Sequence, residues 1–213
     1  MKLNLAERLL VNNPVRALVQ RFYEGPMLRR LGGRLDHARV LDVGCGRGVG
    51  VQILLEQFGA DQVYGIDLDP RQIRRAQQRL AGKSDGQIVL AVASVEQLPF
   101  PDEYFDAVFD FGMLHHVPNW QAGVSEIQRV LKPSALFFFE EVTRDALNRW
   151  LYRTFLDHPA ENRFSEAEFL AELDANGIEP LGAPRRILAN DIFIGIAKRR
   201  TEVEKRPKLP GTR

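Results

Sequence analysis

Residues 40–50 read VLDVGCGRGVG, in which an apolar run ends in an acid and glycine then recurs at every second position. The run RVLDV, residues 39–43, has the length and apolar character of a buried strand. After the glycines, apolar residues recur at helical spacing through residues 51–58. A strand, a glycine turn and a helix in this order begin a βαβ unit, in which glycine lets the backbone come close to a bound ligand.

Four more stretches have the apolar character of buried strands: residues 62–68, 87–93, 105–111 and 135–141. Helical spacing follows the first of them, where Asp69 and Pro70 suit a helix cap and a first turn, and recurs over residues 120–131. Apolar strands that alternate with helices predict a doubly wound α/β fold with a mostly parallel sheet. Two extended segments near residues 178–184 and 191–197 predict an antiparallel pair with a C-terminal edge strand.

The chain of 213 residues fits a single domain. We expect this domain to cover residues 1–200 and to include an N-terminal helical cap over 1–34 and a helical insertion near the acceptor site over 142–164. A basic, disordered tail follows it over residues 201–213. In the cap, Val15, Leu18 and Phe22 follow helical spacing, which predicts an amphipathic helix. Ser165 and Glu168 have the spacing of a capping box, which predicts that a further helix begins there.

Charge and cysteine content limit the function classes. The net charge of +1 gives no global attraction to nucleic acid, although the basic tail and the amphipathic cap could make a weak peripheral contact with an anionic membrane. The single cysteine, Cys45, excludes an internal disulfide and a cysteine-rich metal site, and it favours a reducing compartment. With no signal-peptide pattern at the N-terminus, we expect a cytoplasmic protein.

The glycine spacing distinguishes between nucleotide ligands. A dinucleotide turn has the pattern G-x-G-x-x-G, but Val49 or Val51 stands where the last glycine belongs, so a pyrophosphate ligand loses support. Asp67 ends the next strand, where a carboxylate can accept hydrogen bonds from ribose hydroxyls. Asp42, two residues before the first glycine, can meet a cationic amino group. A ligand with a ribose, an ammonium group and no phosphate is S-adenosylmethionine.

Five stretches between residues 40 and 141 carry a family resemblance: VLDVGCGRG, YGIDLDP, SVEQLPFPDEYFDAVF, MLHHVPN and RVLKPSALFFFEE. In this order the chain resembles a class I S-adenosylmethionine-dependent methyltransferase. It is most similar to the small-molecule group that includes the ubiquinone and menaquinone biosynthesis methyltransferases. The resemblance covers about half of the chain and implies a Rossmann-like methyltransferase fold, S-adenosyl-L-methionine as cofactor, and methyl transfer by in-line displacement.

The resemblance also implies which residues line the cofactor: Asp42 at its amino group; Gly44, Cys45 and Gly46 along the methionine part; Asp67 at the ribose; Leu68, Ser94 and Val95 at the adenine; Phe109 and Asp110 beside the sulfonium. The family often has an aspartate where Ser94 stands. A serine hydroxyl can still accept a hydrogen bond from the adenine amino group, but more weakly than a carboxylate.

Candidates for a general base are His115, His116, Asp110 and Glu140. We expect no metal site, because adjacent histidines in one loop do not readily bind one metal and no cluster of acids or cysteines completes a ligand set. Glu140 and Glu141 end the fifth strand, and we expect one to face the acceptor and the other to cap the next helix or be solvated.

The expected acceptor is a small or lipid-like molecule that enters over the fourth and fifth strands. Four aromatic residues of the insertion could form an apolar wall there or belong to the core: Trp150, Tyr152, Phe155 and Phe164. The chain lacks the Asn-Pro-Pro-aromatic and Pro-Cys signatures of nucleic-acid base methyltransferases, which argues against that substrate class. Two alternatives stay open: a nicotinamide-dependent oxidoreductase, which shares the fold, and a non-catalytic regulator that binds S-adenosylmethionine.

Overall fold

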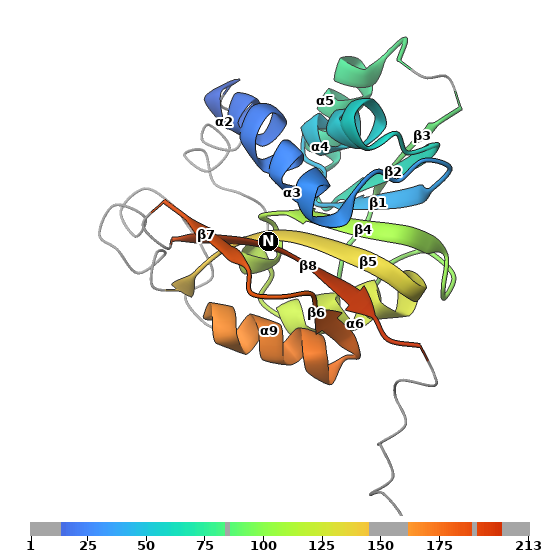
Figure 1. Ribbon diagram of the computed structural model, residues 1–213. Coiled ribbons are helices and arrows are strands. Elements are labelled where there is room, and N and C mark those ends of the chain that lie inside the picture. Colours follow the sequence, from blue (N-terminus) through green and yellow to red (C-terminus); the bar gives the residue numbers. More distant parts are fainter. Residues whose placement is uncertain (1–13, 84–85, 145–161, 189–190, 202–213) are drawn as a thin grey trace, which may run out of the picture.

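The computed structural model describes residues 14–83, 86–144, 162–188 and 191–201 (Figure 1). Its strands are β1 (Arg39–Val43), β2 (Gln62–Asp67), β3 (Ile88–Val92), β4 (Phe105–Phe111), β5 (Leu131–Val142), β6 (Ile178–Pro180), β7 (Arg185–Ile187) and β8 (Ile192–Arg199). They form one sheet in the order β3-β2-β1-β4-β5-β8-β6, with β7 also paired to β8. Strands β1 to β5 pair in parallel, and β8 runs antiparallel to β5, β6 and β7. The predicted fold class and the antiparallel C-terminal pair are confirmed.

The helical segments of the described residues are α2 (Pro14–Val19), η1 (Gln20–Glu24), α3 (Gly25–Gly32), α4 (Val49–Ile53), η2 (Leu54–Phe58), α5 (Pro70–Leu80), η3 (Leu114–His116), α6 (Trp120–Val130) and α9 (Glu166–Ala175). Segments η1 and η2 are π-helical turns, and η3 is a 3₁₀ turn. The helices α3, α4 and α5 lie on one face of the sheet, and α6 and α9 lie on the other (Figure 1). None of the helices described is long and apolar enough to cross a bilayer.

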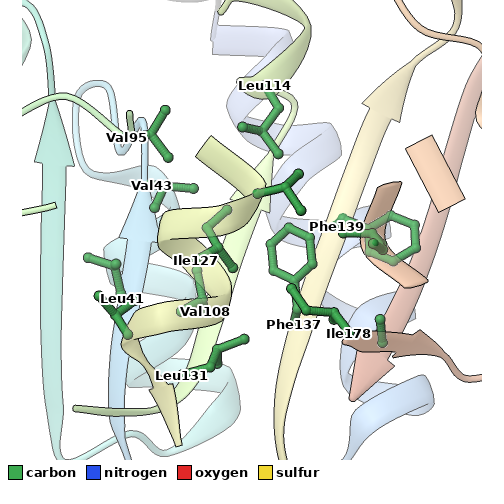
Figure 2. Packing of buried hydrophobic residues seen from close by; sticks show 14 of the residues in the cluster. Leu41, Val43, Val95, Val108, Leu114, Ile127, Leu131, Phe137, Phe139 and Ile178 are labelled. Atoms are coloured by element: carbon green, nitrogen blue, oxygen red, sulfur yellow. The ribbon is translucent and has the colours of Figure 1, made fainter. Parts of the chain in front are cut away.

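The period of two along each strand divides the core into two layers. On the side of α3, α4 and α5, the sheet contributes residues such as Val40, Phe109 and Phe138. On the side of α6 and α9 it contributes residues such as Val108 and Phe139, which Figure 2 shows packed with their neighbours. Because both faces are covered, the strands read as nearly continuous apolar runs in the sequence.

Local signals at two helix ends act as the sequence predicted. The carboxylate of Asp69 accepts a hydrogen bond from the Arg71 N–H, which caps α5. At α9, the side chain of Ser165 accepts a hydrogen bond from the Glu168 N–H, and the Glu168 carboxylate accepts one from the Ser165 N–H. This reciprocal capping box satisfies N–H groups that have no partner inside the helix.

Strand β5 begins at Leu131, four residues before its predicted start. The segment Lys132-Pro133-Ser134 reads as a turn, and Ser134 does have a positive φ of 64°. Pairing between Leu131 and Phe105 nevertheless extends the strand, with a register shift before Ala107. Cross-strand hydrogen bonds therefore override the local turn signal at this position.

The structure decides the place of two sets of apolar residues. Phe164 is buried, with its ring centroid 4.7 Å from that of Trp120, so of the two alternatives left open for it, an acceptor wall or the core, the core holds. Helical segments do occupy residues 14–32, where Leu28 is buried, but Val15, Leu18 and Phe22 lie outward, with Phe22 69% exposed. The other aromatic residues of the predicted wall lie outside the described residues.

Candidate active site

The polar residues of interest meet where β1, β2, β4 and β5 end. Strand β1 lies between β2 and β4, and the chain leaves β1 toward one side of the sheet and β4 toward the other. In open α/β sheets this reversal leaves a crevice at the carboxyl ends of the central strands. The glycine turn follows β1 at this edge, and the turn η3 follows β4.

Three glycines of the turn have left-handed backbone conformations: φ is 70° at Gly44, 52° at Gly46 and 80° at Gly48. A Cβ at Gly44 would collide with the side chain of Met113, and one at Gly48 would come within 2.9 Å of Leu80 Cδ1. At Gly46, by contrast, no atom of the other described residues, its two chain neighbours aside, lies within 4 Å of the position a Cβ would take. Two of the glycines therefore allow close packing, and the third borders open space.

Asp67 holds the glycine turn against the end of β2. Its Oδ2 accepts a hydrogen bond from the Gly46 N–H at 3.0 Å, and its Oδ1 accepts one from the Asp69 N–H at 2.8 Å. Burial raises the pKa of the Asp67 carboxyl, and the two backbone N–H groups oppose part of this rise. Each carboxylate oxygen retains a further acceptor position, which a ligand hydroxyl could use. The next residue, Leu68, is 46% exposed and offers apolar surface beside the carboxylate.

Asp42 is buried at the end of β1, facing the first turn of α4. Burial, together with the nearby Asp110 and Asp67 carboxylates, holds its pKa well above the ordinary range. Its Oδ2 has no hydrogen-bond partner among the described residues. A Cβ at Gly50 would collide with this carboxylate. The position of the Asp42 carboxylate therefore requires glycine at the fourth glycine of the turn.

Asp110 ends β4 on the opposite face of the sheet from Asp42, since Asp42 pairs with Phe109 and Asp110 with Val43. Its Oδ1 accepts a hydrogen bond from the Met113 N–H at 2.8 Å, which fixes the start of the β4–α6 connection. The Met113 side chain in turn lies over Gly44. Burial and the neighbouring Glu141 carboxylate hold the pKa of Asp110 well above its usual range.

Glu141 is fully buried on the same face as Asp110. Its carboxylate lies 2.6 Å from Nδ1 of His115 and accepts a hydrogen bond from the Leu114 N–H at 2.7 Å. The expectation that one of the two glutamates would be solvated or cap the next helix is wrong. Glu141 was not among the predicted site residues, although two acids at the end of an alternating strand could have signalled one on each face.

Glu140 points to the other face, where the N-terminal helices lie. One of its oxygens accepts a hydrogen bond from Arg16 at 3.1 Å, and Arg16 also pairs with the buried Glu24. Burial raises the pKa of Glu140 well above its usual range, and the Arg16 guanidinium opposes part of that rise. Helix α2 is therefore joined to the end of β5 by a buried ion-pair cluster.

The remaining predicted site residues divide into core and loop positions. Val95 and Phe109 are buried in the core, with the ring of Phe109 stacked 4.1 Å from that of Phe138. Ser94 accepts a hydrogen bond from the Glu96 N–H in a local turn. Burial raises the pKa of the Cys45 thiol well above its usual range, which argues against a nucleophilic role.

His116 shares its turn with His115, and their ring centroids lie 4.1 Å apart. In the part of the chain that the structure describes, no group of three or more metal-ligating side chains occurs.

Residues 41–139 match a family model described as a methyltransferase domain. A little under half of the chain is therefore similar to methyltransferase domains. A 2-methyl-6-phytyl-1,4-hydroquinone methyltransferase from Synechocystis sp. is 34% identical over 65% of this chain and 46% of its own length. A demethylmenaquinone methyltransferase from Geobacillus kaustophilus is 33% identical over 51% of this chain and 47% of its own length. The chain thus spans less than half the length of these curated relatives.

The fold of the methyltransferase domain is supported separately by solved structures. A S-adenosylmethionine-dependent methyltransferase from Aquifex aeolicus aligns with a TM-score of 0.73 over 93% of this chain and all of its own, at 22% identity. The domain implies S-adenosylmethionine as cofactor. The structure fits this group at two points: the open side of Gly46 gives room for a ligand backbone, and the buried Asp42 oxygen lacks a partner that a cationic amino group would supply.

Proposed function

We propose that the protein transfers a methyl group from S-adenosylmethionine to a small or lipid-like acceptor. The single observation that carries the proposal is the arrangement of the glycine turn, open at Gly46 and held by Asp67, which has acceptor positions left for ribose hydroxyls. When bound, the cofactor supplies an activated methyl group on a sulfonium. The protein's own contribution is then alignment and the exclusion of water.

The residues of the chain have distinct roles in this proposal. Asp67 would accept hydrogen bonds from the ribose hydroxyls, and Asp42 would meet the amino group, where a cation would favour its charged form. Leu68 would pack against the adenine, and the Ser94 hydroxyl would lie at its edge. Asp110 would border the sulfonium end. Where the acceptor must lose a proton, His115, His116, Asp110 and Glu140 remain the candidates to receive it.

The names of the relatives support a lipid-like acceptor. They act on hydroquinones and menaquinone precursors by name, and a fatty-acid O-methyltransferase from Mycolicibacterium smegmatis is 33% identical over half of this chain. We propose that such an acceptor reaches the site over the ends of β4 and β5. The outward apolar residues of α2 are suited to a weak contact with a membrane that holds it. The single cysteine, free and buried, favours a reducing, cytoplasmic location.

Calorimetric titration tests cofactor choice directly. We expect S-adenosylmethionine and S-adenosylhomocysteine to bind and NAD not to bind. Tight binding of NAD without binding of S-adenosylmethionine would overturn the proposal in favour of an oxidoreductase.

Asp67→Ala removes a charge-assisted acceptor and should raise the Kd for S-adenosylhomocysteine about 10- to 100-fold. The matched control is Asp61→Ala. Asp61 is an exposed acid just before β2 that pairs with His37, and its replacement should leave the Kd for S-adenosylhomocysteine unchanged.

Turnover distinguishes an enzyme from a regulator. Mass spectrometry on quinol, phenol, amine and fatty-acid panels should detect a product heavier by one methylene unit together with S-adenosylhomocysteine. Cofactor binding with no product in any of these panels would favour the regulator.

A further inference from the structure

Glu141 connects the end of β5 to the turn after β4. Its buried carboxylate accepts hydrogen bonds from the Leu114 N–H at 2.7 Å and the Val142 N–H at 3.1 Å, and it lies 2.6 Å from His115 Nδ1. When Glu141 is ionised it can only accept hydrogen bonds, so its bond to His115 then requires the proton on Nδ1. In a neutral imidazole this leaves Nε2 as the basic nitrogen.

We propose that Glu141 is a positioning residue for His115, holding the imidazole in the tautomer whose Nε2 takes a proton from the methyl acceptor. The inference rests on the proposed function. In the step, the acceptor's proton passes to Nε2 and the electron pair of the broken bond stays on the acceptor atom, which becomes the nucleophile. The ring becomes an imidazolium, and the Glu141 carboxylate opposes the new charge.

Among the residues that the structure describes, the titratable groups around the His115 ring include Glu141 from β5, Asp110 from β4 and His116 from the same turn. Burial raises the pKa of Glu141 to about 7, while Asp110, beside it, has a pKa well above its usual range. The hydrogen bond between the two carboxyl groups raises the pKa of Asp110 and lowers that of Glu141, so the proton of this pair lies on Asp110. When His115 becomes an imidazolium, the carboxylate it faces is that of Glu141.

A purely structural anchor would make a different demand on this position. The N–H groups of Leu114 and Val142 need an acceptor oxygen, which the amide of a glutamine also supplies. Only a proton-accepting His115 needs the negative charge. Glu141→Gln therefore separates the two roles, since it retains an acceptor oxygen and removes the charge.

The wild-type protein gives the first test, which needs no variant that could fail to fold. Nitrogen-15 NMR of the histidine rings, with His115→Gln to assign the signals, should show His115 protonated on Nδ1. A neutral ring protonated on Nε2 would overturn the proposal.

Glu141→Gln gives the second test. We expect the pKa of His115 to fall by about 1 unit or more, because its anionic partner is gone. The acid limb of the kcat/KM profile should move to lower pH by the same amount, and kcat should fall about 10-fold as the weaker base is also less well held. An unchanged His115 pKa overturns the proposal, and so does a shifted pKa with an unchanged pH profile.

Glu140→Gln is the matched control for the NMR measurement. Glu140 is equally buried and adjacent in sequence, but it lies on the other face of the sheet and pairs with Arg16. The pKa of His115 should stay within about 0.3 units of its wild-type value there, since no direct contact is lost. An equal fall in both variants would mean a general loss of negative charge and would overturn the specific role of Glu141.

Failure of the proposed function has its own signature in these experiments. If wild-type protein binds S-adenosylhomocysteine but methylates no acceptor, the catalytic role fails together with the proposed function. The tautomer and the His115 pKa in Glu141→Gln then still decide whether the two residues are coupled.

Discussion

The carboxyl ends of β1 and β2 and those of β4 and β5 satisfy their polar groups in different ways. At β1 and β2, the Asp67 carboxylate is held by backbone N–H groups of the adjacent turns. At β4 and β5, Glu141 bonds a histidine ring as well as backbone, and Glu140 pairs with Arg16 from a helix more than a hundred residues away in sequence. The first pair of ends is a local construction, whereas the second depends on distant parts of the chain.

This difference suggests that the two pairs of strand ends have separate roles in the site. A glycine turn with one acid presents backbone atoms to a ligand and requires little else, which suits a cofactor of fixed shape. Side chains brought together from several elements can vary in charge and proton affinity, which suits the acceptor and its chemistry. Four predictions test the comparison.

Glu141→Ala should have the largest effect. It leaves the buried N–H groups of Leu114, His115 Nδ1 and Val142 without their acceptor, and each unsatisfied group costs about 1–3 kcal/mol. We expect the free energy of unfolding to fall by about 4 kcal/mol in urea denaturation. Asp67→Ala should lower the free energy of unfolding by only about 1 kcal/mol, because the N–H groups of Gly46 and Asp69, which it leaves without an acceptor, lie nearer to water. Equal losses in the two variants would contradict the comparison.

The pH dependence of stability should show the buried state of Glu141. Its pKa rises from 4.5 to about 7 on folding, so between these values the folded protein binds more protons than the unfolded chain. The stability contributed by the protonated group is therefore present below about pH 4.5 and is lost as the pH rises to about 7. Relative to Glu141→Gln, wild-type protein should lose about 3 kcal/mol across this window in denaturation curves. A difference that stays constant with pH would contradict the burial of a titrating carboxyl.

Gly50→Ala tests the packing of the glycine turn against Asp42. The added Cβ would meet the Asp42 carboxylate and come within 3.0 Å of Phe111. We therefore expect the free energy of unfolding, measured by thermal unfolding, to fall by about 2 kcal/mol. Gly46→Ala is the matched comparison, since its Cβ would enter open space and only the left-handed backbone would be strained. That strain costs about 1 kcal/mol. A larger loss in Gly46→Ala than in Gly50→Ala would contradict the assignment of Gly50.

Ser94→Asp should have the smallest effect, on cofactor affinity alone. A carboxylate would accept a stronger hydrogen bond from an adenine amino group than a hydroxyl does, by about 1 kcal/mol. Repulsion from Glu96, whose carboxylate is 3.4 Å from the Ser94 hydroxyl, should limit the gain to about threefold in Kd for S-adenosylhomocysteine. Ser94→Asn, which adds bulk without charge, should show no gain by calorimetry. If Ser94→Asp binds S-adenosylhomocysteine more weakly than wild-type protein, Ser94 does not lie at the adenine.

Much of the fold could be predicted because its signals are local. Strands β1 and β4 have the bounds that their apolar runs predicted, and the caps at Asp69 and Ser165 act within a few residues of their own position. The start of β5 was missed because pairing with Phe105, across the sheet, overrides the turn residues near Ser134. The sequence left Phe164 open between a ligand wall and the core, because an aromatic residue in an irregular segment does not reveal its partner.

The sequence by itself determined the order of strands and helices, the glycine turn and the acids that follow it, because each depends on residue spacing along one element. Only the tertiary structure decided what those acids contact. It placed Asp42 against Gly50, and it sent Glu140 and Glu141 to opposite faces, one to Arg16 and one to His115. The physical reason is that burial and partnership set the charge of a carboxyl group, and its partners here come from elements that only folding brings together.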